Sequence, residues 1–500
     1  MKPTRLLLAL IMAAGINALS AQDTLPYNEP FRNQFHFSPK YHWMNDPNGL
    51  VYHKGKYHLF FQYYPEGIVW GPMHWGHATS ADLLHWQELP IALYPDSIGD
   101  IFSGSIVLDK NNSSGFGTAA NPPLVAIYTQ HNMGGEHAGR SDFQNQSIAW
   151  SVDEGRTWNK YRENPVLKNP GIKDFRDPKV SWYQPGKKWI MTLATKDRIT
   201  FYSSKNLKQW GKESEFGQSV GAHGGVWECP DLFALDCNGK KIWVLLVSIN
   251  PGGPNGGSAT QYFTGTFNGK TFAAFDTLTR WVDYGTDNYA GVTYDNTANR
   301  RITIGWMSNW QYANIVPTAN WRGANTLPRT FSLVKGDNGY LLCSAPVTET
   351  KILERNTTAQ TVESGKTIPL AAAGQPSGKR IAVEAMDESF EVLLLNKTGD
   401  TLQIGYDKQK NIFYINRTKA GITNFEPGFG AVHVAPRLLK GKRIKMEIWL
   451  DKAAMELFAD GGSVAMTDVF FAKAPFDAVL FRGASPNTAN IKITSLKGIW

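Results

Sequence analysis

The stretch NDPNGLVYHKGKYHLFFQYY, residues 45–64, joins a polar motif to two runs of strand type. The runs, residues 50–53 and 57–64, are rich in aromatic side chains and are separated by Lys-Gly-Lys. Asn, Asp, Pro and Gly are turn formers, and an acid such as Asp46 among them often bonds only to its own backbone. Taken alone, residues 45–49 therefore predict a turn that leads into a β-hairpin.

The same arrangement recurs along the first two thirds of the chain. Five times in all, a short polar motif leads into two strand-like runs joined by a turn. The further units begin with FSGSIVLDK at Phe102, RDPKVSWYQPGKKW at Arg176, ECPDLFALDCNGKKIW at Glu228 and NYAGVTYDNTANRRITIGW at Asn288. The starts lie roughly 50–75 residues apart, which is the size of a four-stranded propeller blade with its loops.

Helical periodicity is nearly absent from these units, and their apolar runs are short and bounded by Gly, Pro, Asn and Asp. We therefore predict an all-β fold in which residues 30–343 form a five-bladed β-propeller. In such a fold the first strand of each blade lines the central axis. The polar motif that opens each unit should then converge with the others on one funnel.

Beyond residue 350 the strands alternate more cleanly. In KMEIWLD, residues 445–451, Met446, Ile448 and Leu450 face one way while Glu447 and Trp449 face the other. One apolar face per strand indicates two stacked antiparallel sheets, so we predict a β-sandwich over residues 350–500. This domain shows no obvious catalytic constellation, and packing support and glycan binding are both open for it.

The N-terminus has the form of a secretory signal peptide. Lys2 and Arg5 precede an apolar run, residues 6–14, and small residues follow at Ala18 and Ser20. The run is too short to cross a bilayer, and no later segment is long and apolar enough to be a transmembrane helix. We expect residues 1–21 to be a signal peptide and the mature protein to be exported, either extracellular or periplasmic.

Charge and cysteine content limit the other partners. Lys and Arg exceed Asp and Glu by 51 to 43 without forming a basic run, which argues against a nucleic-acid partner. No His/Cys cluster has metal-ligand spacing and no Gly-rich loop cradles phosphate, so we expect neither a metal nor another cofactor. Of the cysteines, Cys229 and Cys237 could pair, but free buried thiols are the commoner outcome for an odd set that includes Cys343.

Three acids, Asp46, Asp177 and Glu228, stand at the heads of different units. Cleavage of a glycosidic bond needs two carboxyl groups, one ionised and one protonated. Burial beside aromatic residues raises the pKa of a carboxyl group, which makes Glu228, after Trp227, the candidate for the protonated one. Asp46, placed among amides and backbone donors, is the candidate for the ionised one.

The motifs WMNDPNG, FQYYP, FSGS, RDP and WECPDLF, in this order, resemble glycoside hydrolase family 32, the β-fructosidases. The resemblance covers nearly the whole mature chain and implies a five-bladed propeller, in agreement with the repeats. It also implies a nucleophile at Asp46, a general acid/base at Glu228 and a transition-state stabiliser at Asp177. A retaining mechanism with carboxyl groups about 5–5.5 Å apart follows from these roles.

The same resemblance implies the lining of a subsite for a single fructose ring. The lining residues carried over in this way are Asn45, Gln62, Trp70, Phe102, Ser103, Arg176 and Trp306.

The segments AHGGVWECPDLF and DNYAGVTYDN are closer to exo-acting fructan hydrolases (exo-levanases and exo-inulinases) than to plant invertases. The resemblance thus implies release of fructose from the ends of levan or inulin, and cleavage of sucrose; the preferred linkage is not fixed by the sequence. A fructosyltransferase of the same family, an inverting arabinanase-type propeller and an exported glycan-binding propeller without catalysis are the alternatives.

Overall fold

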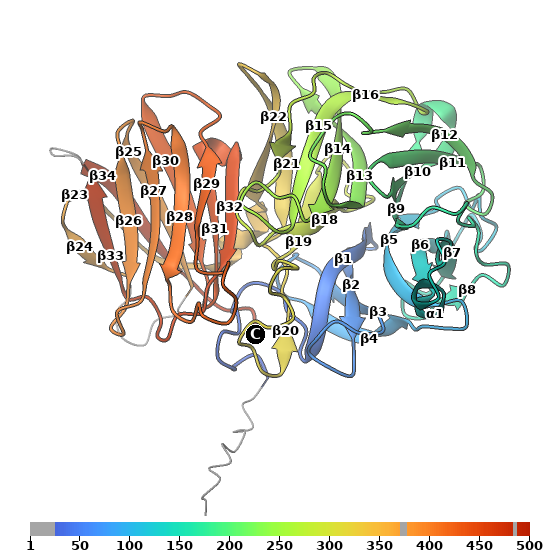
Figure 1. The fold of residues 1–500 in the computed structure, drawn as a ribbon, viewed down its shortest axis with the longest axis horizontal. Helices are drawn as coiled ribbons and strands as arrows, with labels where there is room; N and C mark the ends of the chain where they lie inside the picture. The colour runs from blue at the N-terminus through green and yellow to red at the C-terminus, as the bar shows by residue number, and fades with distance from the viewer. Residues whose placement is uncertain (1–25, 371–377, 484–487) are drawn as a thin grey trace, which may run out of the picture.

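The computed structural model describes residues 26–370, 378–483 and 488–500. Their regular secondary structure is almost entirely β-strand; the helix α1 (Met133–His137) is one short turn after the second strand of its sheet, β6 (Leu124–His131). The predicted signal peptide, residues 1–21, lies outside the described part of the chain. The predicted all-β class is confirmed, with a propeller followed by a β-sandwich (Figure 1).

Residues 42–346, all of them described, form five separate sheets. The strands of these sheets, in chain order, are β1 (His42–His53), β2 (Lys56–Tyr64), β3 (His74–Ser80) and β4 (Gln87–Leu93) with β20 (Trp321–Arg322); β5 (Asp100–Leu108), β6 (Leu124–His131), β7 (Gln144–Ser151) and β8 (Asn159–Lys160); β9 (Phe175–Tyr183), β10 (Lys188–Thr195), β11 (Ile199–Ser204) and β12 (Gly211–Phe216); β13 (Val226–Cys237), β14 (Lys240–Asn250), β15 (Ala259–Phe267), β16 (Phe272–Ala274) and β17 (Arg280–Trp281); and β18 (Tyr289–Thr293), β19 (Ile302–Trp306), β21 (Arg329–Gly336) and β22 (Gly339–Pro346). The first strands contact one another in the cyclic order β1, β5, β9, β13, β18 and back to β1. The sheets are therefore arranged around one axis, in agreement with the sequence units.

Each of these inner strands is irregular where its polar motif lies. In every case two of its residues face one residue of the next strand, which defines a β-bulge. The five bulged pairs are Asn45-Asp46, Phe102-Ser103, Asp177-Pro178, Cys229-Pro230 and Ala290-Gly291. The five motifs therefore occupy equivalent positions in their sheets. A bulge also bends its strand and re-aims the side chains there.

The motif of residues 45–49 is thus not the turn that its composition predicts. It lies inside β1, which has a second register shift between Asn48 and Val51. Gly49 has φ 55°, and a Cβ there would lie 2.7 Å from Ile106 Cδ1. The turn-forming residues here serve the distorted strand, because they supply the backbone conformation and the close approach that the bulges require.

The C-terminal domain consists of two six-stranded sheets in the described residues. Their strands, in spatial order, are β23 (Glu354–Glu363), β34 (Thr488–Leu496), β25 (Gly378–Met386), β30 (Arg443–Leu450), β31 (Ala454–Ala459) and β32 (Val464–Val469) in one, and β24 (Thr367–Pro369), β33 (Ala478–Gly483), β26 (Phe390–Leu395), β27 (Thr401–Asp407), β28 (Ile412–Lys419) and β29 (Val432–Pro436) in the other. Met446, Ile448 and Leu450 pack into the core between the sheets, as their alternation predicts. Trp449 faces the other way and packs near Phe35.

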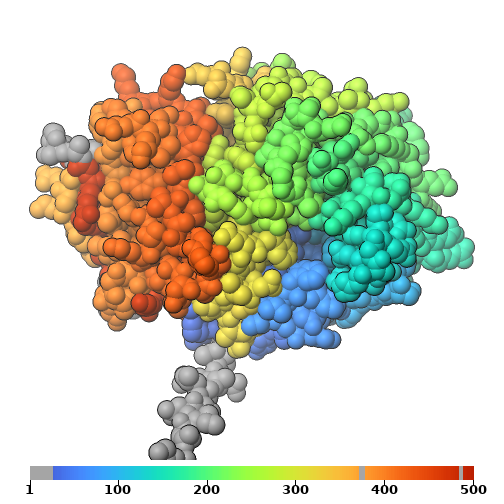
Figure 2. Space-filling view, viewed as in Figure 1, coloured from blue at the N-terminus to red at the C-terminus, as the bar shows by residue number. Residues whose placement is uncertain are grey.

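The two domains abut without a visible gap (Figure 2) and share a buried set of charges. Arg329 of β21 donates to Glu456 of β31 and lies 2.8 Å from Asp283. The two ring nitrogens of His36 lie 2.8 Å from Asp451 and 3.0 Å from Glu456. We call these residues, with the neighbouring Asp287, Arg417, His433 and Asp468, the interface cluster; its ion pairs connect the sandwich to the propeller.

Candidate active site

The structure brings together the three candidate acids, which lie on β1, β9 and β13, the first strands of their sheets. Figure 1 shows these strands at the centre of the propeller. Cys229 connects two of the acids. Its backbone N–H donates to Asp177 Oδ2 over 3.0 Å, and its Sγ lies 3.6 Å from both Asp46 Oδ2 and Asp177 Oδ2. The predicted convergence of the acids is therefore what the fold produces, and we call the region around them the funnel.

Asp46 is held by hydrogen bonds to both of its carboxylate oxygens. Ser103 Oγ donates to Oδ2 over 2.6 Å, and Asn45 Nδ2 donates to Oδ1 over 3.0 Å. The amide of Asn45 is oriented in turn by Trp43, whose Nε1 donates to Asn45 Oδ1 over 2.8 Å. Burial nevertheless raises the pKa of Asp46, the charge of Glu228 adds to this, and the donors oppose it. The donors favour the ionised form of Asp46, as its sequence surroundings predict, but burial has the larger effect on its pKa.

Asp177 is more deeply buried, with an exposed fraction of 5 %. Burial raises the pKa of Asp177 to about 7; Arg176 opposes this rise, and the charges of Glu228 and Asp46 reinforce it. Its φ of 64° lies in the left-handed region, which is strained for a residue other than glycine. A bulge that accepts this strain turns the carboxyl group toward the other two acids.

Glu228 is held by its two neighbours on either side. Arg176 donates to Glu228 Oε1 through Nε at 3.2 Å and Nη2 at 3.0 Å, and the hydroxyl of Tyr289 donates to Oε2. The prediction that Trp227 lies beside this carboxyl group is wrong. Consecutive residues of a strand face opposite sides, so Trp227 packs into the hydrophobic core next to Phe263, and its Nε1 donates to a backbone carbonyl.

The remaining predicted lining residues surround the acids. Gln62 is the β2 residue that faces the Asn45-Asp46 bulge, and Trp306 pairs with Tyr289 in the next ladder. Gln62 Nε2 and Trp306 Nε1 are both buried, and within the described part of the chain neither has a hydrogen-bond partner. Buried donors are normally satisfied, so two orphaned donors beside three acids are typical of a site for a polar ligand.

Two aromatic residues form a further wall. The rings of Trp70 and Phe102 meet edge to face with centroids 6.1 Å apart, and Phe102 stacks on His131 at 4.2 Å. Trp70 is also fixed through its backbone N–H, which donates to Asn314 Oδ1 over 2.9 Å. Most of the candidate residues chosen from the sequence thus lie on or beside the first strands of the sheets, and Trp70, between β2 and β3, reaches the site through Phe102.

Sequence reasoning did not select two residues of the site, Tyr289 and Cys229. Tyr289 heads the fifth unit, NYAG, so the repeat itself was the available signal. Cys229 was considered only as a disulfide partner; Cys229, Cys237 and Cys343 are all free and buried.

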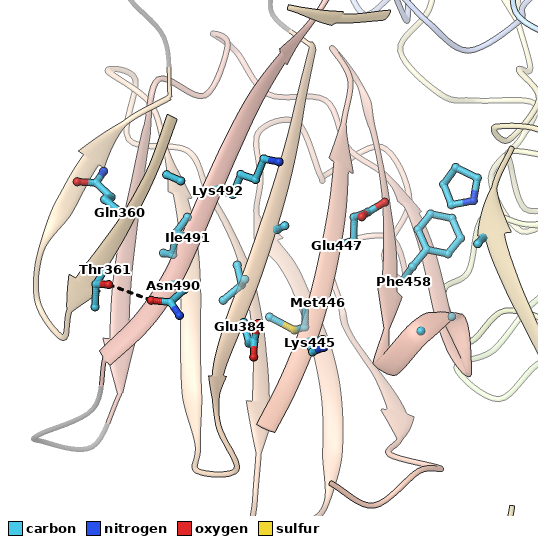
Figure 3. A pocket seen from close by; sticks show the side chains of 17 residues that line it. Gln360, Thr361, Glu384, Lys445, Met446, Glu447, Phe458, Asn490, Ile491 and Lys492 are labelled. Carbon is cyan, nitrogen blue, oxygen red and sulfur yellow. Dashed lines mark hydrogen bonds between the residues drawn. The ribbon is translucent and has the colours of Figure 1, made fainter. Parts of the chain in front are cut away.

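A separate groove of about 690 Å³ lies on the outer face of the sandwich (Figure 3). Its polar lining includes Gln360, Thr361, Glu384, Lys445, Glu447 and Lys492. The charges pair across neighbouring strands, with Arg443 at 2.6 Å from Glu384 and Arg380 at 2.7 Å from Glu447. Such paired, alternating charges are typical of a solvated sheet face.

Comparison with known proteins agrees with this geometry. The model of the glycosyl hydrolases family 32 N-terminal domain matches residues 36–346, and that of the family 32 C-terminal domain matches residues 347–497. A levanase of Bacillus subtilis (strain 168) is 43% identical over 516 residues, covering 99% of this chain and 74% of the levanase. An extracellular exo-inulinase of Aspergillus niger is 37% identical over 543 residues, covering 98% and 99% of the two chains.

Among solved structures, an exo-inulinase from Aspergillus awamori superimposes with a TM-score of 0.87 at 34% identity. The match covers 95% of this chain and 100% of the exo-inulinase chain. The resemblance drawn from the motifs is confirmed: this chain belongs to family 32 of the glycosyl hydrolases.

Proposed function

We propose that the protein is an exo-acting, retaining β-fructosidase that removes terminal fructose from fructans and cleaves sucrose. The observation that carries this proposal is the convergence of Asp46, Asp177 and Glu228 on one funnel, beside two orphaned buried donors. The names of the levanase and exo-inulinase relatives support the substrate class.

In this proposal Asp46 is the nucleophile. Its carboxylate attacks the anomeric carbon of the terminal fructosyl unit while Glu228 gives a proton to the leaving oxygen. The C–O bond breaks as the Asp46 ester forms. Glu228 then takes a proton from water, the water oxygen bonds to the anomeric carbon, and the ester bond breaks to release fructose.

Arg176 and Asp177 support parts of this division of roles. Arg176, whose pKa is raised by the surrounding acids despite its burial, stays charged next to Glu228 and stabilises the carboxylate left after proton transfer. Asp177 lies close enough to the other two acids to feel their charges. We assign to it the binding of fructose hydroxyls, which strengthens as positive charge develops on the ring.

The walls suit one sugar ring. Gln62 and Trp306 offer donors to hydroxyl oxygens, and Trp70 with Phe102 offers an apolar edge to the ring carbons. A site that encloses one terminal fructose unit in this way shortens a fructan from its end. Sucrose presents the same terminal fructosyl bond in its smallest form.

We also propose export of the protein, with residues 1–21 as the signal peptide, a propeller over 30–343 and a sandwich over 350–500. The Aspergillus niger relative is described as an extracellular exo-inulinase, which supports export. In the described residues no helix has the length and hydrophobicity needed to cross a membrane.

The test is incubation of the purified protein with levan, inulin and sucrose, with Asp46→Asn as the control for contaminating activity. We expect fructose as the only early product of the fructans. A ladder of oligosaccharides would contradict exo action, and larger oligosaccharides from sucrose would favour the fructosyltransferase. The anomer of the first product, followed by NMR, should be the retained one; inversion would favour the arabinanase-type alternative.

A further inference from the structure

Three neighbouring blades carry polar residues of different types, Arg176, Glu228 and Tyr289, at one equivalent position. The residue just before the bulge of each inner strand is Met44 in β1, Ile101 in β5, Arg176 in β9, Glu228 in β13 and Tyr289 in β18. Met44 and Ile101 are apolar and fully buried. The other three form a row in which Glu228 stands between the matching residues of the blades on either side.

Arg176 and Tyr289 each contact a different carboxylate oxygen of Glu228. Arg176 contacts Oε1 with two N–H groups, and a guanidinium can only donate. A proton on Oε1 would face these donors, so the acid form of Glu228 carries its proton on Oε2. The partner of Oε2 is the hydroxyl of Tyr289, which donates to it.

We propose that Tyr289 is a positioning residue that aims Glu228 Oε2 at the glycosidic oxygen and stabilises the carboxylate formed when its proton leaves. This inference rests on the proposed function. In the first step the proton passes from Oε2 to the leaving oxygen; in the second, Oε2 takes a proton from water. Tyr289 donates to Oε2 throughout and transfers no proton itself.

The surroundings of Tyr289 suit such a role. Its exposed fraction is 1 %, and it pairs with Trp306 in the ladder and packs in the same hydrophobic cluster. The next residue, Ala290, has φ 54°, so the strand is held in a bulge at this point. Burial and the charge of Glu228 raise the pKa of Tyr289 well above its ordinary value, so its hydroxyl keeps its proton.

Tyr289→Phe removes this hydroxyl, and Tyr294→Phe is the matched control. Tyr294 lies in the same hydrophobic cluster and is fully buried, and its hydroxyl has no hydrogen-bond partner within the described residues. Both changes remove one buried oxygen from the fifth blade. Thermal unfolding of the two variants measures the structural effect that they share.

We expect Tyr289→Phe to lower kcat on sucrose by about tenfold to a hundredfold, a part of what general acid–base catalysis supplies, with KM changed less than twofold. The basic limb of the pH profile should move to higher pH, because the carboxylate loses a donor. On an aryl β-fructofuranoside, whose leaving group needs little protonation, the loss should shrink. Tyr294→Phe should behave as the wild type in all three measurements.

Equal activity of the two variants would overturn the proposal, as would a loss in Tyr289→Phe that is the same on both substrates with an unmoved pH profile. If Tyr289→Phe does not fold, wild-type protein labelled with 3-fluorotyrosine supplies the test, since a more acidic hydroxyl donates more strongly. Its basic limb should move to lower pH, and no movement would contradict the proposal. A wild-type protein that releases no fructose refutes the proposed function instead.

Discussion

Two buried clusters of charge in this molecule have opposite electrostatic characters. In the interface cluster each carboxylate lies against a cation, as when Arg329 contacts both Asp283 and Glu456. At the propeller axis, Arg176 contacts Glu228 and opposes the raised pKa of Asp177, while the charge of Glu228 raises the pKa of both Asp46 and Asp177. Both clusters contain Asp, Glu and Arg, but the side chains of Arg329, Asp283 and Glu456 are fully buried, whereas those of Arg176 and Glu228 are 13 % and 19 % exposed.

The pKa values follow this difference. Burial works against ionisation in both places, yet Arg329 and His36 hold the pKa of Glu456 below its ordinary value. In the funnel, burial raises the pKa of Asp177 to about 7 even though Arg176 opposes it. Asp287 is the exception at the interface, because burial and the nearby Asp468 raise its pKa against the effect of Arg417. Buried carboxylates that are paired with cations connect the two domains, whereas buried carboxylates without enough cations have raised pKa values and suit proton transfer.

The largest expected effect is on activity, from the funnel. Asp46→Asn should lower kcat by about 10⁴-fold or more, because it removes the nucleophile. It should not lower the unfolding temperature, since the pKa of Asp46 is raised in the folded protein and its charge therefore opposes folding at neutral pH. Kinetics and thermal unfolding on the same sample check both parts; a destabilised variant would show that the funnel acids serve the fold.

At the interface cluster we expect a loss of stability with little change in activity. Arg329→Met should lower the free energy of unfolding by about 3–5 kcal/mol, because it leaves Asp283 and Glu456 buried without their cation. Below its unfolding transition the variant should keep kcat within a factor of about three. Denaturant unfolding measures the first effect, and a stability equal to that of the wild type would contradict the comparison.

The pH dependence of stability sharpens the same contrast. Burial lowers the pKa of His36, but Asp451 and Glu456 outweigh this and raise it to about 9. A pKa raised above the unfolded value of about 6.5 gives stability that is complete below pH 6.5 and is lost as pH rises to 9. The free energy of unfolding should fall by about 3 kcal/mol across this window. His36→Gln should be less stable and show no such fall; an unchanged slope would exclude His36 as its source.

The smallest effect comes from a single donor in the funnel. Ser103 lowers the pKa of Asp46 against the effect of burial, so Ser103→Ala should raise it further. Because the nucleophile must be ionised, the acid limb of kcat/KM should move up by about one pH unit. Ser105→Ala is the control, since Ser105 Oγ bonds to the backbone of Pro178 and Val180 rather than to an acid. A shift of the same size in both variants would refute this assignment.

The sequence predicted the fold where patterns are local. Alternation identified the sandwich core through Met446, Ile448 and Leu450, and repetition located the acids at the heads of the units. It did not predict the bulges, because composition alone does not distinguish a turn at residues 45–49 from a distorted strand. It placed Trp227 beside Glu228 because the two are adjacent in sequence, whereas alternation along β13 turns their side chains to opposite faces.

Contacts between residues far apart in the chain could also not be predicted from the sequence. Arg329 and Glu456 are 127 residues apart, and nothing in either neighbourhood marks the other as its partner. Tyr289 contacts Glu228 only because the propeller sets equivalent positions side by side. Such pairs follow from closure of the ring and docking of the sandwich, which local patterns do not encode.

The covalent intermediate tests the central claim most directly. Glu228→Gln lacks the base that completes the second step, so an aryl β-fructofuranoside, which needs little acid assistance, should leave the fructosyl unit attached to the protein. Mass spectrometry of the intact chain and its peptides should then find one added fructosyl unit, carried by Asp46. The unit on another residue, or no added unit while the variant still turns over, would contradict the account.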